Sequence, residues 1–518
     1  MKKPLPIGIS SFRELIKSGC LYIDKTHIVH ELITSTSRRY FFSRPRRFGK
    51  SLLLSLFKEV FSGSSDLFSD TWLGQHSSYT WPVYPVIDLD LSRLDSSSVE
   101  RLEAGLCQQL DAVAVRYGID LSTKTFPVAK MTDLVVQLAQ QEKVVFLVDE
   151  YDSPILKTMG SDRELSHRNR EVLNQFFTAI KSVNEYMRFV FFTGVSKFAK
   201  TSVFSGLNHL SDVSLEPKVA ALCGYTDEEV RNFLSSYLDE FAFVHAISAE
   251  AALLEMRTWY NGYRFSRDAV TVYNPYSIFF ALERKLRENY WFETGTTKFL
   301  VDSITDKFEQ FMRLESLEVK AGSLGAFEIE EVPLVNLLFQ TGYLTIEKYS
   351  YETQRYALKY PNQEVKQAFD ECLMSGFLRL ERAAVDAYQL RLQRAITVRD
   401  IEGFCCILQE LFSQIPYDLH IKKEAYYHTF LHIIGTLLGL DVQSEVHTSL
   451  GRIDLTLQTR DTIYLFELKL NKDPLEALNQ IKTKRYYEKY EQLGKVIYLI
   501  GLAFTFETKM LEHAWEQL

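Results

Sequence analysis

The chain has 518 residues, of which 46% are hydrophobic and 24% charged, the balance of a folded globular protein. This length exceeds what one hydrophobic core supports, so we expect several domains. A net charge of −8 excludes binding of nucleic acid through a strongly basic overall surface, so such a partner needs a local basic patch. The six cysteines lack CxxC spacing, which argues against a zinc site or a disulfide framework. Without an apolar run long enough for a signal peptide or a membrane span, we expect a cytoplasmic protein.

The N-terminal part alternates short apolar runs with amphipathic segments. The apolar runs cover residues 39–43, 83–89, 144–148 and 188–192. The helical segments between them cover residues 51–61, 99–116, 131–140 and 171–183. Continuous apolar runs between amphipathic helices are typical of buried parallel strands. We therefore expect an α/β layered sheet.

A phosphate-binding loop is predicted between the first strand and the first helix. The segment Arg44–Ser51 reads RPRRFGKS, and Gly49-Lys50-Ser51 opens the helix. A strand, a loop and a helix in this order direct backbone N–H groups and a helix N-terminus at phosphate. Lys50 is expected on the β and γ phosphates of ATP and Ser51 on Mg²⁺. Arg44 stands where such loops usually begin with glycine.

Carboxylates at the end of a second apolar strand complete the predicted nucleotide site. Asp149 is expected to hold Mg²⁺ through water, and Glu150 to orient the attacking water. Thr193, at the end of a third strand, could sense the γ-phosphate, or could be a turn or cap residue. Arg46 and Arg47 could stabilise charge on the transferring phosphoryl group, or could belong to a solvated basic loop.

The middle of the chain predicts two smaller parts and a connector. Residues 216–289 read as helices and suggest a small lid domain. Residues 332–378 read as helix, strand pair and helix, an order that fits a winged-helix unit. The alternative is a helix-and-hairpin packing module without DNA contact. Residues 372–414 are expected to form connecting helices.

A carboxylate-bearing hairpin is predicted near the C-terminus, with alternating strands at Gly451–Gln458 and Ile463–Leu470. Counting outward from a two-residue loop places Asp454 opposite Glu467, with Cβ atoms about 4.5–5.5 Å apart. Lys469 joins the same face. The apolar residues expected on the other face are Ile453, Leu455, Phe466 and Leu468.

Two carboxylates at that distance repel each other unless a cation lies between them, and their oxygens suit Mg²⁺ or Mn²⁺. With such a metal at Asp454 and Glu467, Lys469 could position the water that attacks a phosphodiester. The alternative is a solvated face on which Glu467 and Lys469 simply pair.

The segment after the hairpin, Leu475–Tyr490, is predicted as one amphipathic helix with Gln480, Lys484 and Tyr487 on one face. Its basic residues, a local patch for nucleic acid or a solvated face, are Lys482, Lys484, Arg485 and Lys489.

Two histidines lie four apart upstream, at His428 and His432. No third residue has zinc-ligand spacing, so we expect them to be packing or substrate-side residues.

Several motifs together resemble those of the bacterial AAA-ATPase-like family. They are Tyr22–Thr26, Arg44–Ser51, Val148–Asp152, Tyr260–Phe265 and Tyr273–Tyr276. Members of this family resemble archaeal-type P-loop ATPases and commonly carry a C-terminal nuclease domain of the PD-(D/E)xK type. The resemblance covers nearly the whole chain and implies that Lys25 and Thr26 approach the nucleotide.

The hairpin resembles the core of PD-(D/E)xK nucleases. The resemblance implies that Asp454 is the first acidic position and that residues 467–469 form the E-x-K motif. Gln480 then matches a supporting catalytic position. Glu424, on a helix before the hairpin, would supply another metal-binding acid, and Glu445 competes for that role.

Together these observations predict an α/β protein: a P-loop NTPase domain, a helical lid, a winged-helix-like middle and a restriction-endonuclease-like α/β domain. The expected boundaries are 1–215 for the ATPase domain, 216–290, 291–378, a connector at 379–415, and 416–518 for the nuclease domain. The predicted function is ATP binding and hydrolysis coupled to a Mg²⁺- or Mn²⁺-dependent endonuclease that acts on DNA. The alternative is an ATP-dependent signalling or scaffold protein whose C-terminal domain binds nucleic acid or protein without catalysis. No membrane partner is expected, and a homo-oligomer is left open.

Overall fold

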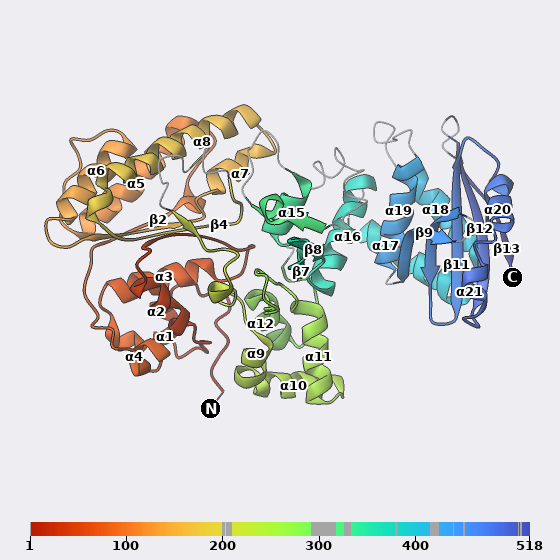
Figure 1. Cartoon of the computed structure of the whole chain (residues 1–518), viewed down its shortest axis with the longest axis horizontal. Coiled ribbons are helices and arrows are strands. Elements are labelled where there is room, and N and C mark those ends of the chain that lie inside the picture. The colour runs from red at the N-terminus through yellow and green to blue at the C-terminus, as the bar shows by residue number, and fades with distance from the viewer. Residues whose placement is uncertain are drawn as a thin grey trace. The chain divides into compact units, whose positions relative to one another are not determined.

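The computed structural model describes residues 2–198, 203, 210–291, 318–325, 333–378, 382–414, 424–438, 440–448, 451–505, 507 and 510–518. These residues form two compact units (Figure 1). The N-terminal unit contains the described residues up to 291 together with 318–365, and the C-terminal unit contains those from 366 onward. Among the helices of these ranges, none combines the length and apolarity that crossing a membrane requires.

A parallel five-stranded sheet with the order β2-β3-β4-β1-β5 forms the centre of the N-terminal unit. Its strands are β1 (Arg39–Ser43), β2 (Val86–Asp90), β3 (Val144–Asp149), β4 (Met187–Gly194) and β5 (Ser211–Asp212). Every residue of β3 is buried, because helices cover both faces of the sheet. The predicted layered α/β fold is confirmed.

Helices lie on both faces of this sheet, as Figure 1 shows. One face carries α1 (Phe12–Lys17), α2 (Thr26–Thr34), α3 (Lys50–Phe61) and α4 (Trp72–His76). The other carries α5 (Val99–Arg116), α6 (Pro127–Leu138), α7 (Ser153–Met159) and α8 (Arg163–Thr178). Short 3-10 helices lie at Ser65–Phe68, Leu91–Arg93, Ala179–Tyr186, Pro217–Val219 and Ala321–Leu324.

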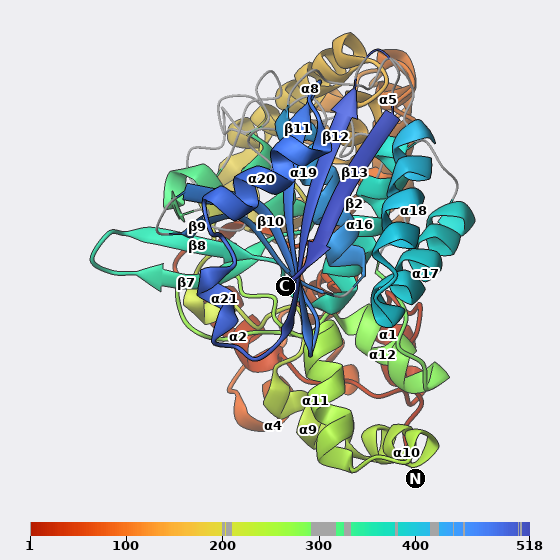
Figure 2. The same ribbon diagram turned by 90° about the vertical axis from the view of Figure 1, so that its right-hand side faces the viewer.

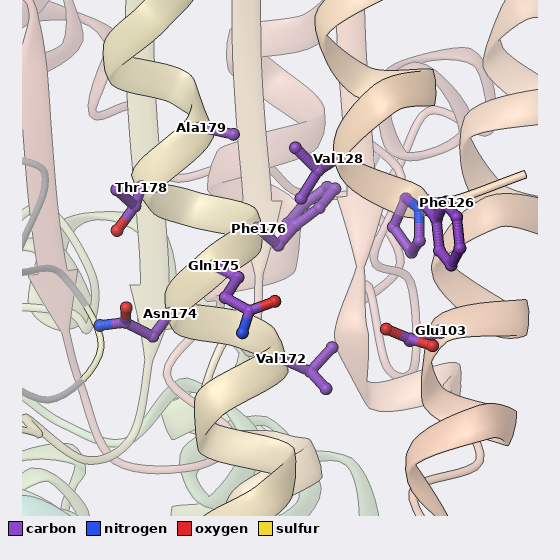
Figure 3. A pocket seen from close by; sticks show the side chains of 10 residues that line it. Glu103, Phe126, Val128, Val172, Asn174, Gln175, Phe176, Thr178 and Ala179 are labelled. Carbon is purple, nitrogen blue, oxygen red and sulfur yellow. The ribbon is translucent and has the colours of Figure 1, made fainter. Parts of the chain in front are cut away.

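A hollow of about 540 Å³ lies among α5, α6 and α8. Figure 3 shows Phe126, Val128 and Val172 at this hollow, with Glu103 as its one carboxylate. Its lining contains none of the residues predicted to bind nucleotide. The hollow is therefore distinct from the predicted phosphate site.

The predicted helical lid consists of α9 (Asp227–Phe233), α10 (Ser235–His245), α11 (Ala249–Tyr260) and α12 (Pro275–Arg284). It begins with a capping box, in which the Thr226 hydroxyl accepts from the Glu229 N–H while the Glu229 carboxylate accepts from the Thr226 N–H. Buried side chains of all four helices, among them Phe241, Met256 and Ile278, form one apolar cluster.

The helix-and-hairpin part follows the predicted order. It contains β6 (Glu318–Lys320), α15 (Leu334–Thr341), β7 (Thr345–Ser350), β8 (Arg355–Lys359) and α16 (Gln363–Leu378). The three strands form an antiparallel sheet with the order β6-β8-β7. Seven of the eight side chains of α15 are buried, which leaves this helix little surface for a DNA groove. The burial favours the packing-module alternative for α15.

The C-terminal unit is built on a mixed sheet with the order β13-β12-β11-β10-β9, in which only β11 and β12 pair in parallel. The strands are β9 (Asp441–Thr448), β10 (Gly451–Gln458), β11 (Thr462–Leu470), β12 (Val496–Thr505) and β13 (Met510–Gln517). The helices are α17 (Arg382–Val398), α18 (Ile401–Gln414), α19 (Glu424–Leu437), α20 (Pro474–Thr483) and α21 (Glu488–Glu491). Figures 1 and 2 show α20 on one face of the sheet and α18 and α19 on the other.

The predicted register of the β10–β11 hairpin is confirmed, because Leu455 pairs with Phe466 and the Thr459 N–H donates to the Thr462 carbonyl. Asp454 lies one residue beyond the end of this ladder. The placement of Ile453 on the face of Phe466 was wrong. Ile453 packs in the cluster of Leu465, Leu478 and Ile481, so at this position tertiary packing, and not the alternation counted from the hairpin loop, decides the face.

The single helix predicted for Leu475–Tyr490 is also wrong, because α20 ends at Thr483 and α21 begins at Glu488. Arg485, between them, has a φ of 46°, which helical residues do not adopt. Tyr486 and Tyr490 are buried against Ile481, so apolar packing favours the break. The predicted stripe of Gln480, Lys484 and Tyr487 on one helix therefore does not form.

Candidate functional site

The predicted phosphate loop lies between β1 and α3, in the expected context. Gly49 precedes α3 with φ 86° and ψ 23°, a left-handed conformation that glycine adopts at little cost. Arg47 is left-handed as well, with φ 67°. Ser51 is exposed in the first turn of α3, where backbone N–H groups have no partner within the helix. The loop and helix end together suit an anion such as a phosphate group.

Lys50 is buried and turned back onto the loop. Its ammonium donates to the carbonyl oxygens of Arg44 and Pro45, each at 3.0 Å. These bonds satisfy a cation that is only 5% exposed. To reach a phosphate, Lys50 must leave one or both carbonyls.

Arg44 points away from the phosphate loop and into the core, where it is 1% exposed. Its guanidinium donates to the carbonyl oxygens of Ser43, Ser214 and Val219. It also lies 4.3 Å from the ring centre of Phe42 and 4.1 Å from that of Phe265. Burial lowers its pKa to about 10, so the group stays charged at neutral pH. Arg44 thus holds the base of the loop, which accounts for a large residue at a position usually taken by glycine.

Arg46 and Arg47 make different contacts. The Arg47 guanidinium is exposed and lies 4.4 Å from the ring centre of Tyr276 in α12. The Arg46 carbonyl accepts from the indole N–H of Trp291 at 3.3 Å. Both arginines thus connect the loop to residues far along the chain.

Asp149, Glu150 and Thr193 meet where β3 and β4 end side by side. The Thr193 hydroxyl donates to Oδ1 of Asp149, and the Glu150 N–H donates to the same oxygen at 3.1 Å. Glu150 has a φ of 46°, a strained conformation for this residue. Thr193 is therefore placed to orient Asp149.

Lys25 is 6% exposed, and its ammonium lies 2.5 Å from both carboxylate oxygens of Glu229 at the start of α9. Burial lowers its pKa, while Glu229 opposes that shift. That Lys25 approaches the nucleotide stays a prediction, and in this structure its ammonium contacts Glu229.

Sequence reasoning gave no role to Asp152, although it lies two residues after Glu150. Its Oδ2 accepts the N–H groups of Val195 at 3.0 Å and Ser196 at 2.6 Å. Burial raises its pKa to about 6. The Tyr151 hydroxyl donates to the Ser196 carbonyl at 2.9 Å. Tyr151 and Asp152 together fix the segment that follows Thr193, a contact that only the pairing of β3 with β4 reveals.

The second candidate site lies at the ends of β10 and β11. Oε1 of Glu467 accepts from the Lys469 ammonium at 2.8 Å and from the Gln480 amide. Asp454 accepts the Leu468 N–H at 2.8 Å through Oδ2. The four residues predicted for nuclease catalysis, Asp454, Glu467, Lys469 and Gln480, are thus brought together by β10, β11 and α20.

The two carboxylate oxygens of Glu467 differ in their contacts. The side chain is 1% exposed, and within the described ranges its Oε2 has no hydrogen-bond partner. Burial raises the pKa of Glu467 to about 7, and the neighbouring charge of Asp454 adds to the rise. A buried, unpartnered carboxylate oxygen beside a second carboxylate fits a hard divalent cation such as Mg²⁺ or Mn²⁺.

The two candidates for a third acidic residue, Glu424 and Glu445, have described backbones, but their side chains lie outside the description. Glu424 begins α19, but its side chain is not among those described. Glu445 stands between Ser444 and Val446, which pair with Leu455 and Ile453 of β10, and its side chain is likewise outside the description. Among the side chains that are described, no group of three His, Cys, Asp or Glu residues has metal-binding geometry.

His428 of α19 is a neighbour of the site that the sequence did not identify. Its Nε2 lies 3.1 Å from Oδ2 of Asp454. The spacing of His428 and His432 suggested packing or a substrate-side position, and the contact with Asp454 places His428 beside the carboxylates.

The predicted basic patch is partly neutralised. Lys482 pairs with Glu516, and Arg485 pairs with Glu488 at 3.0 Å. Both pairs are solvent-exposed, so each contributes little to stability. They reduce the charge that this segment can offer to nucleic acid.

Comparison with known proteins bears on both sites. A family model described as "Predicted AAA-ATPase" matches residues 6–204, and one described as "PD-(D/E)XK nuclease superfamily" matches residues 422–514. An uncharacterized protein from the vnfD 5′ region of Azotobacter chroococcum mcd 1 is 35% identical over 521 residues. That alignment covers 98% of this chain and 98% of the relative.

Two solved structures are also similar. A Walker-type ATPase of Pyrococcus abyssi aligns with 71% of this chain and 98% of its own, at 14% identity and a TM-score of 0.33. The Orc1 protein of Aeropyrum pernix, solved in complex with DNA, aligns with 70% of this chain and 91% of its own, at 12% identity and a TM-score of 0.23.

Proposed function

Because this chain belongs to the bacterial AAA-ATPase-like family with a C-terminal domain of the PD-(D/E)XK nuclease superfamily, we propose that it is an ATP-regulated nuclease. In this proposal residues 1–215 bind and hydrolyse ATP, and residues 216–290 form the lid. Residues 291–378 and 379–415 connect the lid to residues 416–518, which cleave phosphodiester bonds in DNA.

In the nucleotide site, the Lys50 ammonium leaves the loop carbonyls and binds the β and γ phosphates. The loop amides and Gly49 cradle the phosphates. Ser51 and Asp149 are the residues that would hold Mg²⁺, which supplies charge neutralisation on the phosphate oxygens. Glu150, next to Asp149, orients the water that attacks the γ-phosphate. Support comes from the joint placement of the exposed Ser51, the buried Lys50 and the Asp149–Thr193 pair at neighbouring strand ends.

In the nuclease site, Asp454 and Glu467 would hold Mg²⁺ or Mn²⁺, with Glu424 or Glu445 as a third ligand. Such a metal polarises the phosphoryl oxygen and lowers the pKa of bound water. Lys469 positions the attacking water, and the Gln480 amide donates to Oε1 of Glu467, which would leave Oε2 for the cation. The observation that carries this assignment is the buried Oε2 of Glu467, which lies beside Asp454 and has no hydrogen-bond partner among the described residues.

The experiment that tests the proposal is incubation of the purified full chain with supercoiled plasmid and Mn²⁺ or Mg²⁺, with and without ATP. Nicked or linear products that need the metal and change in rate with ATP support it. Mobility shifts of DNA without cleavage, at every metal and ATP concentration, indicate instead the non-catalytic binding protein that is the alternative.

A further inference from the structure

The phosphate loop is held from outside by a residue more than two hundred positions away. The indole N–H of Trp291 donates to the carbonyl oxygen of Arg46 at 3.3 Å. Trp291 is 6% exposed, so this bond is shielded from competing water. The neighbouring carbonyls of Arg44 and Pro45 are bonded to Lys50 instead. Three successive loop carbonyls therefore have partners, and the partner of the third, Trp291, lies outside the loop and its helix.

Trp291 is itself fixed by a buried carboxylate. The backbone N–H groups of Tyr290 and Trp291 both donate to Oε1 of Glu364, at 2.8 and 2.9 Å. Glu364, in the first turn of α16, is fully buried. These two bonds fix the backbone from which the indole extends, so the backbone of Trp291 cannot move unless they break.

The end of α15 braces the indole from a second side. The Tyr343 ring packs edge-on against Trp291, with ring centres 5.0 Å apart. Gly342 has a φ of 95°, and a Cβ there would come within 2.7 Å of Pro45 and 3.3 Å of the Trp291 ring. Only glycine fits this contact, so the backbone of α15, the indole and the phosphate loop are packed directly together.

The bond to Arg46 sets the direction of a loop amide. Across a trans peptide the carbonyl of one residue and the N–H of the next point in opposite directions. With its carbonyl turned to Trp291, the Arg46–Arg47 peptide directs the Arg47 N–H away from the indole. Arg47 is left-handed, and left-handed residues in such loops let successive N–H groups converge on an anion.

We propose that Trp291 is a positioning residue for nucleotide binding, which holds the Arg46 carbonyl so that the Arg47 N–H is presented to a phosphate. This role rests on the proposed nucleotide-binding function. It gives α15 and the start of α16 a direct connection to the phosphate loop.

The test is Trp291→Phe in the full chain, which keeps an aromatic ring and removes the donor. Trp259→Phe, the same exchange in α11 at a residue packed against the apolar cluster of the four helices, is the matched control. Calorimetry with ADP, which avoids turnover, and with inorganic tripolyphosphate measures binding. Loss of one hydrogen bond predicts affinity for both ligands about three- to tenfold weaker in Trp291→Phe. We expect the control to bind both ligands as tightly as the parent.

Several results overturn the proposal. If Trp291→Phe binds both ligands as the parent does, or only ADP binding weakens, the indole does not act on the phosphate loop. An equal loss in Trp259→Phe overturns it too. If the parent itself does not bind ADP, the nucleotide-binding function fails first.

A second variant covers the case in which Trp291→Phe does not fold. Tyr343→Leu leaves the indole in place but removes the ring packed against it. We expect a smaller loss of affinity for both ligands, and parent-like affinity counts against the proposal.

Discussion

The ammonium of Lys50 lies 3.0 Å from the carbonyl oxygen of Arg44, inside the loop that it is expected to serve. The same lysine is expected on the phosphates of ATP, so in the proposed complex it exchanges two backbone acceptors for charged ones. Charge-assisted hydrogen bonds are stronger than neutral ones, which favours the exchange. ATP is therefore expected to reorganise the loop as well as to fill it.

Lys50→Ala is expected to reduce ATP affinity about a hundredfold or more, because it removes the buried ammonium that is expected on the β and γ phosphates. Calorimetry on the purified chain measures the effect. Lys58→Ala is the matched control, since Lys58 lies on the same helix and forms a part-exposed pair with Asp88. Unchanged ATP affinity in Lys50→Ala would place the phosphate site elsewhere.

Glu150→Gln is expected to bind ATP normally and to hydrolyse it about 10²-fold or more slowly, because the amide cannot accept a proton from water. Asp149, the expected metal ligand, is left intact. Phosphate release at saturating ATP measures the rate, with the exposed Glu142→Gln as control. Equal rates in Glu150→Gln and the parent contradict the role given to Glu150.

Arg44→Gly, which restores the glycine common in such loops, is expected to destabilise the N-terminal unit. It removes three hydrogen bonds and a guanidinium packed between two aromatic rings, at a cost of about 2 kcal/mol or more. The melting transition of that unit should fall by several degrees. A transition at or above the parent's temperature contradicts the structural role of Arg44.

Much of the fold follows from local sequence signals. The strand Arg39–Ser43 and the helix Val99–Arg116 have the predicted bounds, because hydrophobic periodicity marks their ends. The hairpin register follows from turn length and alternation, so the closeness of Asp454 and Glu467 could be predicted.

Tertiary contacts decided the rest. The break at Arg485 depends on packing of Tyr486 and Tyr490, which no helical periodicity reveals. Trp291 contacts Arg46 only in the folded chain, because the two residues are 245 positions apart in sequence.

Glu364→Gln is expected to flatten the pH dependence of stability. Burial raises the pKa of Glu364 to about 8, well above its value in an unfolded chain. Between about pH 4.5 and 8 the folded state therefore binds more protons than the unfolded state, so stability falls as pH rises. Gln does not titrate, so the variant should match the parent near pH 5 and exceed its stability near pH 9.

Unfolding by denaturant at several pH values, compared between parent and variant, measures the difference. Other buried carboxyls titrate equally in both proteins and cancel. A stability difference that stays constant with pH contradicts the buried, proton-binding state of Glu364.

Thermal melts of the full chain and of Asp454→Asn, each with and without Mn²⁺, test most directly whether the β10–β11 hairpin holds a catalytic metal. We expect Mn²⁺ to raise the melting temperature of the parent's C-terminal unit and to leave Asp454→Asn unchanged. Without metal the variant should be no less stable, because one of two mutually repelling carboxylates is gone while Asn still accepts the Leu468 N–H. ATP hydrolysis should be the same in both proteins. A parent that shows no Mn²⁺-dependent rise, or a rise that persists in Asp454→Asn, contradicts the metal site and with it the proposed nuclease.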